Sequence, residues 1–358
     1  MKTKLACIGV IAAQLIAADR IAYIGTYTKP QGSRGIYMVH VDSSTGKLSN
    51  PELAAESESP SFLAVSKTGK FVYAVNEINR GDVSAFAVET GGKLRFLNKV
   101  KSQGDGPCHL NLDATGKWLA IANYSSGSVA VLPVTADGKL GEAVSTVQHK
   151  GKSVDAGRQA GPHAHAAYFA KDNRSLYIAD LGLDQVKIYS FDAKTGKIAE
   201  TGHLDTPKGA GPRHLALGGN GLAYVLNEMA SSVSVFQNGK LLNTVSAIPT
   251  DYKGNTSGAE IVLHPKGTLL FSSNRGHDSI SIYRANPATG DLKLLGQQAL
   301  GGKTPRGFAL TPDGKFLVAG AQNSDKVFSF AIDLTAGKLT PVGESVAVGS
   351  PVDVRFAR

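Results

Sequence analysis

The chain has 358 residues, 42% of them hydrophobic and 19% charged, which is typical of a soluble globular protein and excludes a disordered or collagen-like chain. Its formal net charge of +9 comes largely from lysines in short polar turns. Because there is no run of Lys and Arg and no interleaved aromatic strip, this charge argues against a nucleic-acid surface and favours, weakly, anionic ligands.

The first eighteen residues have the layout of an export signal. Lys2 and Lys4 precede an uncharged run over residues 5–18 that ends in two alanines. This order is typical of a secretory signal peptide, and the run is too short to span a bilayer comfortably. We therefore expect cleavage near Asp19, a periplasmic or secreted protein, and no stable membrane insertion. The alternative, supported by Ile16 at an imperfect cleavage site, is a buried first strand in a cytoplasmic protein.

A short apolar strand that begins with Pro or Gly recurs along the rest of the chain. Its copies start at Pro60, Pro107, Pro162, Pro212, Gly258, Pro305 and Pro351, so they are 47, 55, 50, 46, 47 and 46 residues apart. Near-constant spacing over almost the whole chain indicates a repeat fold.

Each repeat predicts four antiparallel strands. The opening strand is followed by a polar turn, as at 67–70, and then by an apolar strand, as at 71–75 or 118–122. A third strand alternates apolar and polar residues, as at 231–236 or 279–283, and a second turn leads to a weaker fourth strand. Thr-Gly and Asp-Gly between extended segments indicate hairpins, because glycine readily adopts positive φ.

Four antiparallel strands at this period form a propeller blade, so the sequence predicts an all-β, seven-bladed β-propeller as a single domain over 19–358. The last copy, at 351–356, supplies only its first strand, and segments at 21–27, at 35–41 and near Leu53 supply the other three. We expect the C-terminal strand to pair with the N-terminal strands. This pairing closes the ring and removes two exposed sheet edges.

The strand order predicts that polar side chains gather at one face. The first strand of each blade lies nearest the axis, and the antiparallel second strand ends where the first begins. The opposite face receives the repeated Thr-Gly-Lys and Asp-Gly-Lys turns, which we expect to serve only as hairpin ends. At the first face the sequence places His109, His163, His165, Arg213, His214, Asn227, Glu228, Glu260, Arg275 and Arg306.

Structural roles compete with functional ones at this face. Asn76, Asn123 and Asn323 at strand ends can equally close turns through their side chains. His163 and His165 are two residues apart on one strand, so both should point to the same side, which favours a functional role. A zinc site on this pair lacks a third ligand at a supporting spacing, so we expect neither a metal nor a cofactor.

Segments at these positions resemble the seven-bladed lactonase family, which includes propeller-type 6-phosphogluconolactonases and fungal carboxy-muconate cycloisomerases. The matching segments are Gly161–His165, Gly209–His214, Tyr224–Glu228, Gly258–Ile261, Ser273–Arg275 and Thr304–Phe308. The resemblance implies a catalytic set of His, Arg, Glu and Arg, which falls on His163 or His165, Arg213, Glu228 and Arg275. The remaining site residues, expected to bind substrate, are His109, His214, Asn227, Glu260 and Arg306.

The chemistry of lactone opening fits such a set. A lactone carbonyl gains negative charge as water attacks it, and a fixed guanidinium stabilises that charge. A carboxylate or imidazole takes the proton of the water and later protonates the ring oxygen. Further arginines can hold a carboxylate or phosphate of the substrate. The sequence thus predicts metal-independent hydrolysis of a sugar lactone or similar anionic ring ester.

Two other functions stay open at this point. A cycloisomerase would present the same site and would incorporate no solvent oxygen into its product. A non-enzymatic propeller that binds a ligand or a protein is the third alternative, since fold alone does not fix activity, although the ionisable cluster argues against it. An export signal also fits poorly with the cytoplasmic sugar-phosphate pathway served by 6-phosphogluconolactonase, so the physiological substrate is left open.

Overall fold

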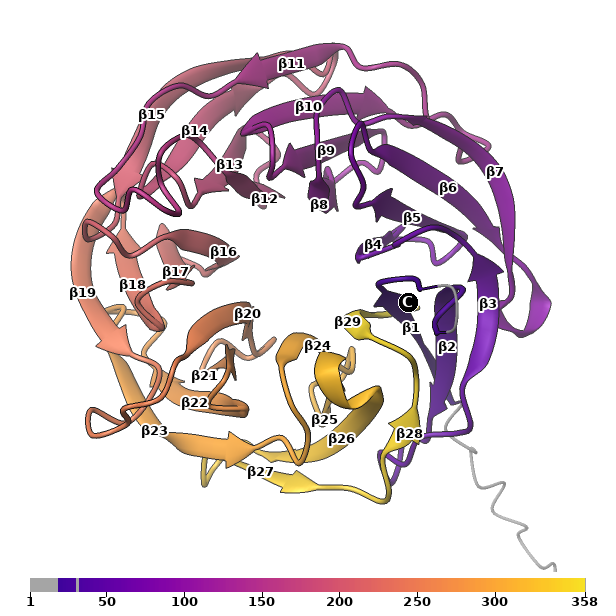
Figure 1. Ribbon diagram of the computed structural model, residues 1–358, viewed down its shortest axis with the longest axis vertical. Helices are drawn as coiled ribbons and strands as arrows, with labels where there is room; N and C mark the ends of the chain where they lie inside the picture. The colour runs from indigo at the N-terminus through magenta and orange to yellow at the C-terminus, as the bar shows by residue number, and fades with distance from the viewer. Residues whose placement is uncertain (1–18, 30–31, 358) are drawn as a thin grey trace, which may run out of the picture.

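The structure, a computed structural model, describes residues 19–29 and 32–357. The predicted signal peptide at residues 1–18 lies outside these described residues. Seven sheets stand in a ring around one axis, as Figure 1 shows, and this confirms the predicted seven-bladed propeller. No helix within the described part of the chain is long and apolar enough to cross a membrane.

Each sheet has its first strand nearest the axis. In the first four blades, from the axis outward, the strands are β29 (Pro351–Phe356), β1 (Arg20–Thr26), β2 (Gly35–Val41) and β3 (Glu52–Glu56); β4 (Phe62–Val65), β5 (Phe71–Asn76), β6 (Asp82–Val88) and β7 (Leu94–Lys101); β8 (Pro107–Leu112), β9 (Trp118–Asn123), β10 (Ser128–Pro133) and β11 (Ser145–Gln148); and β12 (Ala164–Phe169), β13 (Ser175–Asp180), β14 (Gln185–Phe191) and β15 (Ile198–Asp205).

The other three blades follow the same order. Their strands are β16 (Pro212–Leu217), β17 (Leu222–Asn227), β18 (Ser232–Gln237) and β19 (Lys240–Ser246); β20 (Ser257–Leu263), β21 (Leu269–Arg275), β22 (Ser279–Ala285) and β23 (Leu292–Ala299); and β24 (Pro305–Leu310), β25 (Phe316–Ala321), β26 (Lys326–Asp333) and β27 (Lys338–Pro341). The last sheet departs from the four-strand pattern, because the short β28 (Val346–Ala347) also pairs with β26. Two 3-10 turns connect strands within the described residues: η1 (Thr90–Gly92) lies between β6 and β7, and η2 (Gln322–Ser324) lies between β25 and β26.

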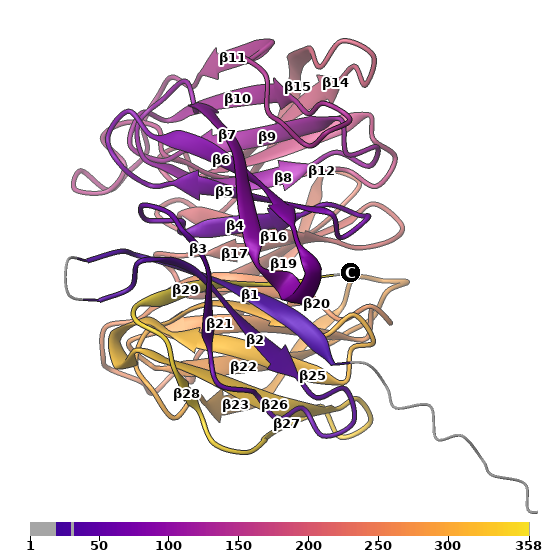
Figure 2. The ribbon, with the colours of Figure 1, turned by 90° about the vertical axis from the view of Figure 1, so that its right-hand side faces the viewer.

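The C-terminal strand closes the ring as predicted. β29 pairs antiparallel with β1, with Val354 opposite Ile24, and Figure 2 shows the two strands side by side. An Asp353 carboxylate oxygen also accepts a 2.8 Å hydrogen bond from the Leu63 backbone N–H of the next blade. The last strand therefore joins the first blade to the second as well as completing the first.

The hydrophobic core lies between neighbouring blades. Successive side chains of a strand point to opposite faces of its sheet, so each blade presents one apolar face to each neighbour. Phe271 of the sixth blade, for example, packs in one cluster with Phe308, Leu317 and Phe330 of the seventh. This packing holds the inner strands rigidly around the axis.

The innermost pairing of six blades contains a β-bulge near the opening of the inner strand. An extra residue in a strand breaks the alternation of side chains and redirects one of them. Among the residues at these bulges, Cys108, Arg213, Glu260, Arg306 and Val352 line one narrow cavity on the axis. The bulges thus turn polar side chains away from the blade interfaces and toward the axis.

Candidate active site

Glu228, directly after β17, is the centre of a group of arginines. It is only 5% exposed. One of its carboxylate oxygens accepts a 2.8 Å hydrogen bond from Arg158, and the other accepts a 3.0 Å bond from Arg213 Nε and lies 3.1 Å from Arg275 Nη2. Burial alone would raise the pKa of Glu228, but Arg275 and Arg213 outweigh it and hold that pKa well below its ordinary value. Glu228 is therefore an ionised anchor for three guanidinium groups.

A chain of buried polar contacts fixes Arg213. Its Nη1 donates to the Ala259 carbonyl and lies 3.1 Å from His214 Nε2. Because arginine only donates, His214 Nε2 accepts, so its Nδ1–H donates to Glu260 at 2.8 Å. Glu260 in turn lies 3.2 Å from Arg355. The guanidinium of Arg213 consequently has little freedom to move, which is the condition for preorganised electrostatic stabilisation.

The two predicted catalytic histidines both contact Tyr124, but their ring nitrogens have different partners. His163 stacks on the Tyr124 ring at 4.5 Å and donates from Nδ1 to the Tyr124 carbonyl at 3.0 Å, which leaves a lone pair on Nε2. His165, at a β-bulge, is buried, with Nε2 3.9 Å from a Glu228 oxygen and Nδ1 3.7 Å from Cys108 Sγ. Burial and then Arg213 lower the pKa of His165 well below its ordinary value, so this ring is neutral at neutral pH.

Arg306 reaches the same axial cavity from the seventh blade. Its Nη2 donates a 2.7 Å hydrogen bond to the Tyr27 hydroxyl, which donates at 2.8 Å to Glu77. Arg306 and Glu77 line the narrow cavity together with Arg213. Arg306 therefore lies beside Arg213, a member of the predicted catalytic set. Tyr27 and Glu77 border the same residues, although neither is among the catalytic or substrate-binding residues predicted above.

Arg158 and Tyr124 are also absent from the site residues predicted above. Arg158 lies in the long loop 149–163 and donates to the Tyr124 hydroxyl at 3.0 Å as well as to the central carboxylate. The fully buried Gln159 secures this loop by donating to Asp184 at 2.7 Å. This loop accounts for the spacing of 55 residues between two repeats, the one signal in the sequence that an extra segment enters the site.

Asn227 does not join the cluster. Its amide donates to the hydroxyls of Ser232 at 3.0 Å and Ser234 at 2.9 Å, both on the neighbouring strand of its own blade. Asn274 bonds Ser279 and Ser281 in the same way, and Asn76 and Asn123 likewise bond within or beside their own blades. An asparagine at the end of the second strand thus ties strands together, which is the structural alternative considered for Asn76 and Asn123.

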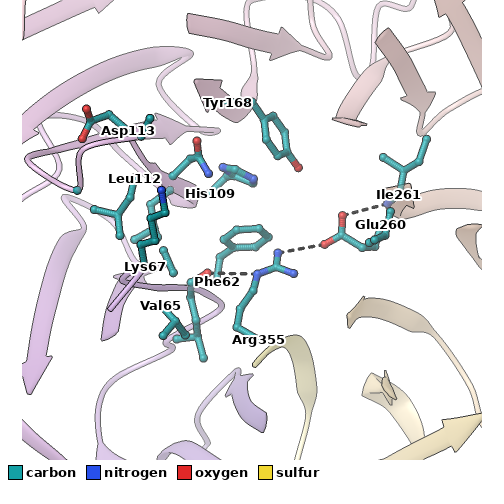
Figure 3. Close-up of a pocket in the computed structure, with 17 residues that line it drawn as sticks. Phe62, Val65, Lys67, His109, Leu112, Asp113, Tyr168, Glu260, Ile261 and Arg355 are labelled. Atoms are coloured by element: carbon teal, nitrogen blue, oxygen red, sulfur yellow. Dashed lines mark hydrogen bonds and ion pairs between the residues drawn. The ribbon is translucent and has the colours of Figure 1, made fainter. Parts of the chain in front are cut away.

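His109 and Glu260 are deeper than predicted. Both line a cavity at the opposite end of the axis (Figure 3), and Glu260 also borders the narrow cavity beside Arg213. The expectation that both join the catalytic residues at one face is therefore wrong for His109, because Cys108 at the bulge takes the axial position there. The hairpin turns of that face also contribute to this cavity, since Lys67 and Gly116 line it.

The arrangement as a whole is rich in positive charge and in neutral imidazole. Four arginines, Arg158, Arg213, Arg275 and Arg306, lie around two carboxylates, Glu77 and Glu228. Within residues 19–29 and 32–357 no group of three or more His, Cys, Asp or Glu is placed to hold a metal ion. Such a site can bind an anion and stabilise an oxyanion with its own side chains.

The sequence is similar to a known protein family and to several of its members. The family described as "Lactonase, 7-bladed beta-propeller" matches residues 21–356. The chain is 35% identical over 345 residues to the 6-phosphogluconolactonase of Bacillus subtilis, covering 94% of this chain and 98% of that protein. It is 30% identical to the 6-phosphogluconolactonase of Formosa agariphila, covering 91% and 96%.

Solved structures agree with these relatives. The periplasmic gluconolactonase of Pseudomonas aeruginosa superposes with a TM-score of 0.89 at 31% identity, covering 95% of this chain and 99% of that one. A protein from Lactobacillus plantarum superposes with a TM-score of 0.88 at 32% identity, covering 95% and 100%. The likeness therefore extends over the entire ring.

Proposed function

Because this chain belongs to the seven-bladed β-propeller lactonase family and is a lactone-hydrolysing enzyme, we propose that it opens a sugar lactone that carries an anionic group. The observation that carries this proposal is the gathering of Arg158, Arg213 and Arg275 on Glu228, with Arg306 in the adjoining cavity. These guanidinium groups outnumber the carboxylates of Glu77 and Glu228 beside them. The excess positive charge favours a substrate with a carboxylate or phosphate in addition to its ring ester.

Arg275 and Arg213 are proposed to stabilise the oxyanion. Arg275 Nε is buried and makes no hydrogen bond to any described residue, so it is free to donate to a substrate oxygen. Burial lowers the pKa of Arg275 to about 10, with Glu228 opposing this shift, so the group stays charged at neutral pH. As water attacks the carbonyl carbon, negative charge grows on the carbonyl oxygen, and a fixed guanidinium stabilises it most in the transition state.

His163 is proposed as the general base. The strongly lowered pKa of Glu228 makes that carboxylate a weak base. The free Nε2 lone pair of His163 can take the proton of the attacking water and return it to the ring oxygen as the ring C–O bond breaks. Glu228 then positions the arginines, and the reaction uses only the chain's own side chains.

Hydrolysis of a lactone panel tests the proposed function. In a pH-stat, we expect 6-phosphoglucono-δ-lactone, or a glucaric acid lactone with its free carboxylate, to exceed neutral glucono-δ-lactone in kcat/KM by about tenfold, from one charge-assisted contact. In water enriched in oxygen-18 the product carboxylate should carry the heavy isotope. A product without solvent oxygen would indicate a cycloisomerase, and inertness toward every lactone would leave only a binding role.

Export of the protein is proposed alongside this activity. It is supported by the two lysines and the uncharged run at residues 5–18, and by the likeness to a periplasmic gluconolactonase. N-terminal sequencing of the protein purified from its native host should begin near Asp19. Recovery of chains that retain Met1 in the cytoplasmic fraction would contradict the proposal and would redirect the search for a substrate to cytoplasmic lactones.

A further inference from the structure

A second cavity opens on the axis at the face opposite the candidate active site. Its volume is about 440 Å³, a size suited to a small molecule. Figure 3 shows its side chains converging from several blades, and those used below are Phe62, Lys67, His109, Asn111, Tyr168, Glu260 and Arg355. The contacts among Arg213, His214 and Glu260 lie between this cavity and the arginine cluster. The mechanism proposed above makes no use of this space.

His109 holds an unused hydrogen-bond donor in the wall of this cavity. The residue is 1% exposed, and its ring is packed 4.1 Å from Phe62 and 4.6 Å from Tyr168 between ring centroids. Its Nδ1 accepts a 3.3 Å hydrogen bond from the Ala167 N–H, which places the proton of the neutral ring on Nε2. No described residue accepts a hydrogen bond from that Nε2, although a buried N–H is normally paired.

The other unused polar groups of the cavity are also able to donate. The Tyr168 hydroxyl, the Asn111 amide nitrogen and the Lys67 ammonium form no hydrogen bond with the described residues. The acceptors, in contrast, are engaged: Glu260 accepts from His214, Ile261 and Arg355, and Asn111 Oδ1 accepts from Phe169. A ligand that pairs with these donors must therefore carry hydrogen-bond acceptors. A sugar, which needs both donors and acceptors from the protein, fits it less well.

Charge and shape narrow the ligand further. Among the described residues, Lys67 at the mouth is the cation of this cavity without a carboxylate partner, since Arg355 is paired with Glu260 at 3.2 Å and with Asp353 at 3.1 Å. The carboxylates of Glu260 and Asp113, which also line the cavity, oppose a doubly charged anion. Phe62, Ile261 and Val262 provide apolar walls. We propose that this cavity binds a small monocarboxylate with an apolar or planar body, its carboxylate accepting from the Tyr168 hydroxyl.

Benzoate and its neutral isostere benzamide test this site by isothermal titration calorimetry on the full protein. Benzoate should bind one equivalent at least about tenfold more tightly than benzamide, and Tyr168→Phe should weaken benzoate about 3- to 10-fold, the range for one hydrogen bond. Tyr177→Phe, the same change on a strand outside the cavity, should leave the affinity unchanged. Lys67→Ala, at the exposed mouth, should weaken benzoate but not benzamide, and it serves if Tyr168→Phe does not fold.

Three results would overturn the proposal. Equal affinity for benzoate and benzamide, or no binding of either, would show that the cavity does not select a carboxylate. Unchanged benzoate affinity in both Tyr168→Phe and Lys67→Ala would place the ligand elsewhere. Loss of benzoate binding in Arg275→Ala would assign it to the arginine cluster at the other end of the axis, and the lactonase assay of the same variant separates that outcome from a failure of the proposed function.

Discussion

Arg213→Ala should lower the turnover of the lactone substrate by about 10²- to 10³-fold, the cost typical of removing one donor to a developing oxyanion. The guanidinium is held by Glu228, by the Ala259 carbonyl and by His214, so the protein, rather than the substrate, fixes its position. Alanine removes a charge that is already in place before the reaction begins. The loss should therefore fall on kcat more than on KM.

Glu228→Gln should have an effect of the same order for a different reason. The glutamine keeps the size of the side chain but removes the negative charge that Arg158, Arg213 and Arg275 share. Three guanidinium groups would then repel one another without a common anchor and leave their positions. Because Glu228 is proposed as an anchor and not as the base, the shape of the pH–rate profile should persist in Glu228→Gln at the lower rate and change in His163→Gln.

Steady-state kinetics with the preferred lactone measure these effects, and circular dichroism checks that each variant keeps its β-structure. Lys315→Ala, an exposed change in a hairpin turn of the opposite face, should retain wild-type activity. Full activity in both Arg213→Ala and Glu228→Gln would refute the mechanism. Activity lost in Glu228→Gln together with the acidic limb of its pH profile would instead make that carboxylate the base.

The overall fold follows from the sequence because each of its determinants is local. Turn residues such as Gly69 and Gly314 adopt φ of 70° and 73°, and Gly314 leaves no room for a Cβ against the ring of His264. These turns recur at the repeat spacing, so strands, blades and their number can be counted along the chain. The closing pair of β29 and β1 follows from the same count, since the last repeat supplies one strand of a blade and the N-terminal segments supply the other three.

The details of the site follow less well, because they depend on β-bulges. Period-two alternation assigns consecutive residues such as Cys108 and His109 to opposite sides of a sheet, but the extra residue at the bulge sends Cys108 to the axis. His109 is displaced with it toward the other cavity. A bulge of this kind leaves no mark in hydrophobic periodicity. The same limit applies to Arg158, which enters the site from a loop without repeat symmetry.

Asn227 illustrates the opposite error. Asn227 does lie at the end of its strand, as the topology predicts. A polar residue at that end of a strand need not point its side chain toward the axis, however. The serines at 232 and 234, two residues apart on the next strand, offer it partners inside the blade. A buried amide takes the partners that lie nearest, because an unpaired polar group in the core is costly. The serines at alternate positions of the third strand are the feature of the sequence that predicts this inward orientation of Asn227.

Deletion of residues 351–358 should abolish cooperative folding, the largest effect on stability expected for this chain. Val352, Val354 and Phe356 of β29 are at most 8% exposed. Burying a side chain of this size contributes about 1.5–3 kcal/mol, so the three together match much of the 5–15 kcal/mol that holds a typical domain folded. The deletion also removes Asp353, which bonds the backbone of Leu63 in the next blade.

Denaturant unfolding followed by circular dichroism measures this loss, with Val354→Ala as a graded comparison. Val354→Ala keeps the backbone pairing of β29 with β1 and leaves a small cavity among Ala22, Ile24 and Val318, so it should lower the midpoint while keeping a single transition. The truncated chain, in contrast, exposes the inner edge of β1 and opens the ring, so it should aggregate or unfold without a sharp transition. A truncated chain with the wild-type midpoint would mean that the other six blades hold the ring closed without β29.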